Sequence, residues 1–184
     1  MSTRRVSRKR QAARRGGYDP VMTAHHTTPR RGGEEQQRLD LALTDLFERR
    51  ITFNQTLGLS VESVRAAGPT IHFAMRPELV GHYLHGRLHG GVISATLDAM
   101  GALALMVAIG EKHCDESADQ ILHRFAKMGT IDLRVDYLHP GVGKSFTASA
   151  VVTRLGGRIG STQMRLVNDQ GTLISTAAAA YVIS

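Results

Sequence analysis

The sequence is poor in several residue types, and each shortage excludes a class of protein. Its 184 residues include one cysteine and no tryptophan. The single cysteine, Cys114, cannot form a disulfide within the chain, so we expect an unreactive thiol in a reducing, cytoplasmic compartment. The first 33 residues contain no apolar run of the kind found in secretory signals, so we expect no such leader.

Acidic residues are almost missing from the first 33 positions, where nine lysines and arginines accompany one acid, Asp19. This segment carries a charge of +8, and the remaining 14 basic and 15 acidic residues give the rest of the chain −1. The net charge of +7 therefore describes a tail and indicates no specific nucleic-acid partner for the body. We predict a basic, disordered tail over 1–33 and one folded domain over 34–184. A weak electrostatic hold of the tail on nucleic acid or anionic lipid is the alternative.

Long uncharged apolar runs are also scarce. The longest, Val92 to Gly110, is interrupted by Asp98 and is rich in alanine and glycine, which favours a buried helix over a membrane span. A carboxylate is rarely buried in such a helix without a partner or a function. Asp98 is therefore the first candidate functional residue.

The segments around this run predict the fold class. We expect an amphipathic helix over about 34–55 that ends near Gly58, and a hairpin of strands over 59–67 and 70–75. A loop over 78–88 leads into the central helix, and a surface connection over 111–128, with a helical turn or two, leaves it. Strands are expected over 131–137, 146–155, 158–167 and 172–183, and the first of them alternates with a period of two. One buried helix followed by long antiparallel strands predicts an α+β domain with a curved sheet wrapped around that helix.

Four motifs in this arrangement resemble a known family. His89-Gly90-Gly91, followed by an acid nine residues after the histidine, is similar to the hotdog-fold acyl-CoA thioesterases of the PaaI type. The stretches 130–141, 157–160 and 171–177 match the strands and turns that follow in that family. The stretch 87–93, RLHGGVI, is most similar to its YigI-like branch. The resemblance covers 34–184 and implies a hotdog fold and the hydrolysis of fatty or aryl acyl-CoA thioesters.

The resemblance also implies roles for the glycines and the acid. The main-chain amide of Gly90 would face the thioester carbonyl, and Asp98 would act as general base for water or as nucleophile. Elementary chemistry supports this assignment, because the amino end of a helix presents unpaired N–H groups, and neither Gly90 nor Gly91 has a side chain to block a ligand. Asp98 lies about 12 Å of axial rise beyond Gly90. We therefore expect a homodimer whose two helices share two sites, and the resemblance implies that such dimers can pair into tetramers.

Further candidates follow from the resemblance and from residue chemistry. Thr130 stands where some family members carry a hydroxyl that helps to place the attacking water. His82 stands near the position of a loop asparagine that this sequence lacks, and could replace it as a donor; His85 is the second choice for this role. Arg158 stands on a turn that commonly meets the nucleotide end of coenzyme A, and a planar cation suits phosphate; Arg134 and Lys144 are weaker candidates of this kind.

The remaining expectations concern the acyl group, the helix entry and metals. The acyl chain is expected along the central helix, against Ile93, Leu97 and Met100. His89 is expected to hydrogen-bond the backbone at the helix entry. His82, His85 and His89 have spacings that suggest a metal site, but the glycines among them oppose one continuous helix, so we predict no metal. No cofactor is expected, since coenzyme A belongs to the substrate. The alternative function is a non-catalytic acyl-CoA binding or regulatory module; a dehydratase would require a different histidine–acid motif.

Overall fold

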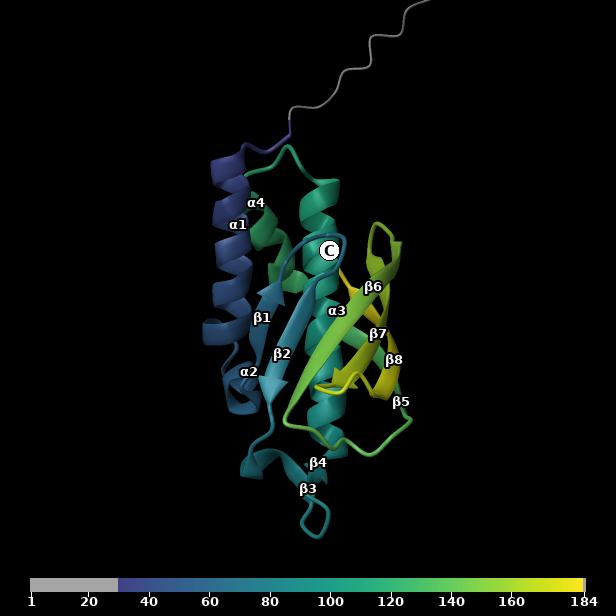
Figure 1. The fold of residues 1–184 in the computed structure, drawn as a ribbon. Helices are drawn as coiled ribbons and strands as arrows, with labels where there is room; N and C mark the ends of the chain where they lie inside the picture. Colours follow the sequence, from purple (N-terminus) through teal and green to yellow (C-terminus); the bar gives the residue numbers. More distant parts are fainter. Residues whose placement is uncertain (1–29, 184) are drawn as a thin grey trace, which may run out of the picture.

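The computed structural model describes residues 30–183, in which an antiparallel sheet of six strands curves around one long helix (Figure 1). The strand order is β1-β2-β6-β7-β8-β5. The strands are β1 (Ser60–Ser63), β2 (Thr70–Ala74), β5 (Gly129–Tyr137), β6 (Ser145–Leu155), β7 (Ile159–Asn168) and β8 (Leu173–Val182). All neighbouring strands pair antiparallel. The predicted α+β architecture is confirmed.

The long helix is α3 (Gly90–Lys112), the predicted central helix. Its side chains facing the sheet, such as Leu97, Met100 and Leu105, are completely buried. By length and composition α3 could cross a membrane, since its most apolar 18-residue window has a mean hydropathy of 2.0. In this fold 61% of that window is buried, and packing under the sheet accounts for the apolar composition.

The amino-terminal helix is less regular than the sequence predicts. It consists of α1 (Gly33–Asp45), a π-helical turn η1 (Leu46–Arg50) and α2 (Thr52–Leu57), and it ends at Gly58 with φ 71°. The helix breaks at Ile51, where the backbone is extended. The side-chain amide of Asn54 donates to the carbonyl of Phe47 at 3.1 Å, so a carbonyl freed by the break keeps a partner. The prediction of one continuous helix over 34–55 is thus wrong at Ile51, and the prediction that it ends near Gly58 is confirmed.

The predicted loop and the predicted surface connection both contain short elements, and helical turns were expected in the second. The predicted loop over 78–88 holds a 3-10 turn η2 (Pro77–Leu79) and the hairpin of β3 (Val80–His82) and β4 (Arg87–Leu88). The connection over 111–128 contains α4 (Ala118–Arg124), which begins at a capping box formed by Ser117 and Gln120, and η3 (Phe125–Lys127).

The folded domain begins slightly before residue 34. The guanidinium of Arg31 donates to the carbonyls of Gly110 and His113, both at 3.1 Å, and so binds the carboxyl end of α3. Arg30 pairs with Glu111 at 2.9 Å. Residues 1–29 of the predicted tail lie outside the described residues.

Candidate functional site

Asp98 lies in the third turn of α3 and is half-buried. The hydroxyl of Thr130, near the start of β5, donates to Oδ1 of Asp98 at 2.9 Å. The two residues are 32 positions apart in the sequence, and the fold brings them together because β5 runs back along α3. Thr130 can therefore orient the Asp98 carboxylate, or a water molecule beside it.

Asp98 and Thr130 form part of the wall of a cavity of about 310 Å³. Most of the remaining wall is apolar and comes from α3, from the amino-terminal helices and from the segment that precedes β5. These lining residues are Phe47, Ile51, Phe53, Asn54, Ala95, Ala99, Ala102, Met106, Phe125, Met128, Gly129 and Tyr181. An apolar pocket with a few polar groups in its wall is typical of a site for an apolar ligand that reacts at one end.

The residues predicted to hold the acyl chain lie on the other side of α3. Ile93 and Leu97 are 3% and 0% exposed and pack in the core, as does Met100. None of the three lines the cavity. Since α3 is apolar on all sides, its periodicity could not tell the face against the sheet from the face that lines a cavity. The cavity face carries small residues instead, Ala95, Ala99 and Ala102 at helical spacing.

The amino end of α3 presents one free donor. His89 is the N-cap, and its Nδ1 accepts the N–H of Gly91 at 2.8 Å. The N–H of Gly90 has no acceptor within residues 30–183. The hydroxyl of Tyr137 donates to the carbonyl of Gly90 at 3.1 Å. The oxyanion-type donor at this end is therefore Gly90, while the Gly91 amide is occupied by the cap.

Strand β5 contacts both parts of α3 that the sequence singled out. Thr130 near its start meets Asp98, and Tyr137 at its end meets Gly90. Asp98 follows Gly90 by eight positions in the helix, which is about 12 Å along the axis. The two groups therefore do not form one site within a single chain.

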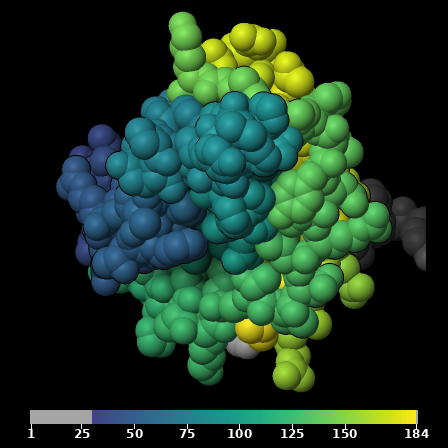
Figure 2. Space-filling view, turned by 90° about the horizontal axis from the view of Figure 1, so that it is seen from below, coloured from purple at the N-terminus to yellow at the C-terminus, as the bar shows by residue number. Residues whose placement is uncertain are grey.

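The β3–β4 hairpin covers the amino end of α3, where its side chains gather in Figure 2. Gly81 packs directly on His89, since a Cβ at Gly81 would lie 2.4 Å from the His89 Cα. The Nδ1 atom of His82 is buried without a hydrogen-bond partner among the described residues, and its ring stacks on His85 with centroids 4.7 Å apart. His82 is thus near the helix end, with one ring nitrogen unused.

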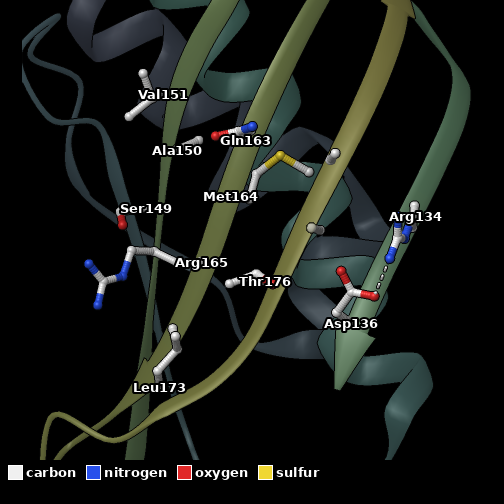
Figure 3. A pocket seen from close by; sticks show the side chains of 12 residues that line it. Arg134, Asp136, Ser149, Ala150, Val151, Gln163, Met164, Arg165, Leu173 and Thr176 are labelled. Carbon is white, nitrogen blue, oxygen red and sulfur yellow. Dashed lines mark hydrogen bonds and ion pairs between the residues drawn. The ribbon is translucent and has the colours of Figure 1, made fainter. Parts of the chain in front are cut away.

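The predicted phosphate-binding arginine lies apart from this pocket. Arg158 is exposed in the turn between β6 and β7, beside a hollow of about 290 Å³ that Arg154 also lines. The weaker candidates lie elsewhere. Arg134 pairs with Asp136 at 3.1 Å, at the edge of a larger cavity of about 540 Å³ on the outer face of the sheet (Figure 3). That cavity contains neither Asp98 nor Thr130. Lys144 lies just before β6.

Two residues at the site, Tyr137 and Tyr181, were not singled out by reasoning from the sequence. Tyr137 lies in the stretch 130–141 that resembles the family, but only as part of the strand alternation. Tyr181 lies on a strand with no motif around it, so nothing in the sequence marks its contact with Asp98. Within residues 30–183 no group of three or more His, Cys, Asp or Glu side chains could hold a metal ion.

Comparison with known proteins assigns the family. The model of the thioesterase superfamily matches residues 85–175, which include both α3 and β5. The chain is 36% identical over 139 residues to the medium/long-chain acyl-CoA thioesterase YigI of Salmonella typhimurium. The aligned region covers 76% of this chain and 90% of that protein. The chain belongs to the thioesterase superfamily. The corresponding YigI of Escherichia coli is 34% identical over the same length and coverage.

Solved structures place this superfamily member among hotdog folds. A protein of Shewanella oneidensis related to the thioesterase superfamily is 33% identical, with a TM-score of 0.77 over 81% of this chain and 97% of that one. The Escherichia coli PaaI protein has a TM-score of 0.62 at 15% identity over 80% of this chain and 94% of that one, a likeness in fold alone. The predicted hotdog fold and the predicted relationship to YigI are both confirmed.

Proposed function

We propose that this thioesterase-superfamily protein hydrolyses fatty acyl-CoA thioesters of medium to long chain to the free acid and coenzyme A. The observation that carries the proposal is the Asp98 carboxylate in the wall of an apolar cavity, hydrogen-bonded by Thr130. The names of the YigI relatives point to the same substrates. A cavity of about 310 Å³ lined by alanine, methionine and phenylalanine side chains suits an alkyl chain.

Each group near the cavity has a role in this reaction. Asp98 activates water as a general base or attacks the thioester itself, and Thr130 orients the carboxylate or the water. The free N–H of Gly90, at the positive end of α3, stabilises the oxyanion that forms at the carbonyl. His89 holds the helix entry by accepting the Gly91 amide. His82 stands at the same helix end and offers a donor to the substrate.

The site is completed across a homodimer. Strand β5 is at the edge of the sheet and exposes Ile131 and Tyr137, each more than half accessible. An edge strand with apolar side chains is a template for pairing with another chain. Two copies of β5 that pair antiparallel about a two-fold axis set the Thr130 end of one beside the Tyr137 end of the other. Asp98 then faces Gly90 of the partner subunit, which resolves their separation within one chain. Pairing of such dimers into tetramers is part of the same proposal.

Coenzyme A extends from this site onto the surface. Arg158 and Arg154 offer two guanidinium groups to phosphates at the β6–β7 turn. No cofactor or metal takes part in the proposed reaction, and a cytoplasmic location stays a prediction.

A thiol-release assay over a panel of acyl-CoA chain lengths tests the enzyme against the binding module. The wild type is expected to release coenzyme A, and Asp98→Asn and Asp98→Ala are expected to reduce kcat by about 10³-fold or more. Isothermal titration with a non-hydrolysable acyl-CoA analogue runs in parallel. Tight binding by a wild type that releases no thiol would favour the binding module, and full activity of both variants would exclude the role of Asp98.

A further inference from the structure

Tyr181 on β8 is a buried tyrosine whose hydroxyl points at α3, the helix that carries Asp98. Its side chain is 1% exposed, and its hydroxyl donates to the main-chain carbonyl of Asp98 at 3.0 Å. It also lines the cavity that Asp98 and Thr130 share. A buried phenol requires a hydrogen-bond partner, and this one uses the backbone of the candidate catalytic residue.

The helix leaves room for this hydroxyl at one position. A Cβ at Gly101 would lie 2.3 Å from the Tyr181 oxygen and 2.8 Å from Oγ1 of Thr162. Glycine inside a helix is destabilising by about 0.5–1 kcal/mol relative to alanine, so a packing reason is expected for it. The reason here is that only glycine lets α3 approach β8 closely enough for the Tyr181 hydroxyl to reach the Asp98 carbonyl.

Tyr181 and Thr130 are directly opposite each other on the paired strands β8 and β5. Thr130 donates to the carboxylate of Asp98, and Tyr181 donates to its main-chain carbonyl. One cross-strand pair therefore binds both the side chain and the main chain of Asp98. Such cross-strand neighbours lie close together and interact. A shift of α3 against Tyr181 therefore also changes the distance between the Asp98 carboxylate and Thr130.

The Tyr181 hydroxyl keeps its proton under the conditions of an assay. Burial and then the nearby charge of Asp98 raise the pKa of Tyr181 well above its ordinary value. The hydroxyl therefore stays protonated and remains a hydrogen-bond donor to the Asp98 carbonyl.

We propose that Tyr181 is a positioning residue that fixes α3 against β8 so that the Asp98 carboxylate meets Thr130 in the reactive geometry. This inference rests on the proposed function. It assigns to Gly101 the role of admitting the tyrosine hydroxyl. Tyr181 acts through Asp98 and does not itself touch the reacting atoms.

The test compares Tyr181→Phe, Thr130→Val and the double variant in the thiol-release assay. Tyr181→Phe should lower kcat by about 10-fold or more, because small misplacements of reacting groups reduce rates strongly, and should leave KM unchanged. In the double variant the loss should be smaller than the product of the single losses, because both hydroxyls act through Asp98. Ser60→Ala is the control: it removes a hydroxyl on β1, the edge strand opposite β5, that donates to the carbonyl of His72 at 3.2 Å and lies far from both ends of β5.

The control variant should keep the wild-type kcat. When it is combined with Thr130→Val, the kcat should equal that of Thr130→Val alone. An unchanged kcat in Tyr181→Phe, a fully multiplicative double variant, or an equal loss in Ser60→Ala would each overturn the inference. If Tyr181→Phe does not fold, Gly101→Ala replaces it, since its methyl group displaces the hydroxyl, and the same kcat loss at constant KM is expected. A wild type without turnover defeats the proposed function and this inference together, whereas an active wild type with an equally active Tyr181→Phe defeats the inference alone.

Discussion

Replacing Gly90 by proline removes one hydrogen-bond donor from the amino end of α3 and little else. Proline is favoured at the first position of a helix, and His89 before it is already extended with φ −67° and ψ 139°, the conformation that a following proline requires. A Cβ at Gly90 would lie 3.5 Å from the Tyr137 ring, an ordinary contact. The variant should therefore fold with α3 intact.

The magnitude follows from the number of donors that remain. The Gly91 amide is engaged by His89, so Gly90→Pro leaves this helix end without a free donor for the oxyanion. Loss of one oxyanion donor reduces kcat by about 10²–10³-fold, or about 2.7–4 kcal/mol. Gly90→Ala keeps the N–H and its methyl group fits, so it should retain kcat within about threefold.

The assay measures kcat and KM for one long-chain acyl-CoA, with thermal unfolding of each variant as the check on folding. We expect a loss of kcat in Gly90→Pro alone. Full kcat in a folded Gly90→Pro, or an equal loss in Gly90→Ala, would refute the role of this amide.

Three further predictions address other parts of the account. Thr130→Val should reduce kcat by about 10-fold with little change in KM, since the hydroxyl orients Asp98 and the acyl pocket stays intact; steady-state kinetics check this, and a changed KM alone would contradict it. Ala102→Phe should fill the cavity and lower kcat/KM for long-chain more than for short-chain acyl-CoAs by about 10-fold, and a uniform loss across chain lengths would contradict that position for the acyl chain. The hydrogen-bonded guanidinium of Arg124 holds the pKa of Glu116 below its usual range. Glu116→Gln should therefore lower the unfolding free energy at neutral pH by less than about 1 kcal/mol. The difference between wild type and variant should vanish as the pH falls below the ordinary glutamate pKa and through the lowered pKa of Glu116. Denaturant titrations at neutral pH and at a pH below the lowered pKa check this.

The sequence was most informative where a pattern has one physical meaning. The run after Gly90 is too apolar to be exposed, which predicted a buried helix. The observed helix α3 ends at Lys112, two residues after the predicted end at Gly110. The alternation along 131–137 likewise corresponds to β5. Asp98 was singled out as a charge in that apolar helix, and the structure places Thr130 against it.

Contacts between distant segments were beyond this kind of reasoning. The bond from Tyr181 to Asp98 joins positions 83 residues apart, and nothing near Tyr181 marks it as different from the neighbouring strand residues. Reasoning from the sequence placed the acyl chain against Ile93, Leu97 and Met100, which pack in the core and do not line the cavity, because a helix apolar on every side gives no polar face to orient it. The position of the acyl chain stays a prediction. The π-helical turn before Ile51 was also missed, since it leaves no mark on the spacing of apolar residues over so short a stretch.

The shared site is tested most directly by mixing two inactive variants. Purified heterodimers of Asp98→Asn and Gly90→Pro, separated by different affinity tags, are assayed for thiol release beside each parent homodimer. In a shared site, the Asp98 of the proline variant faces the intact amide of the asparagine variant, so one of the two sites is whole. We expect about half the wild-type turnover per heterodimer. A heterodimer no more active than its parents would contradict the claim that each site takes its carboxylate and its amide from different subunits.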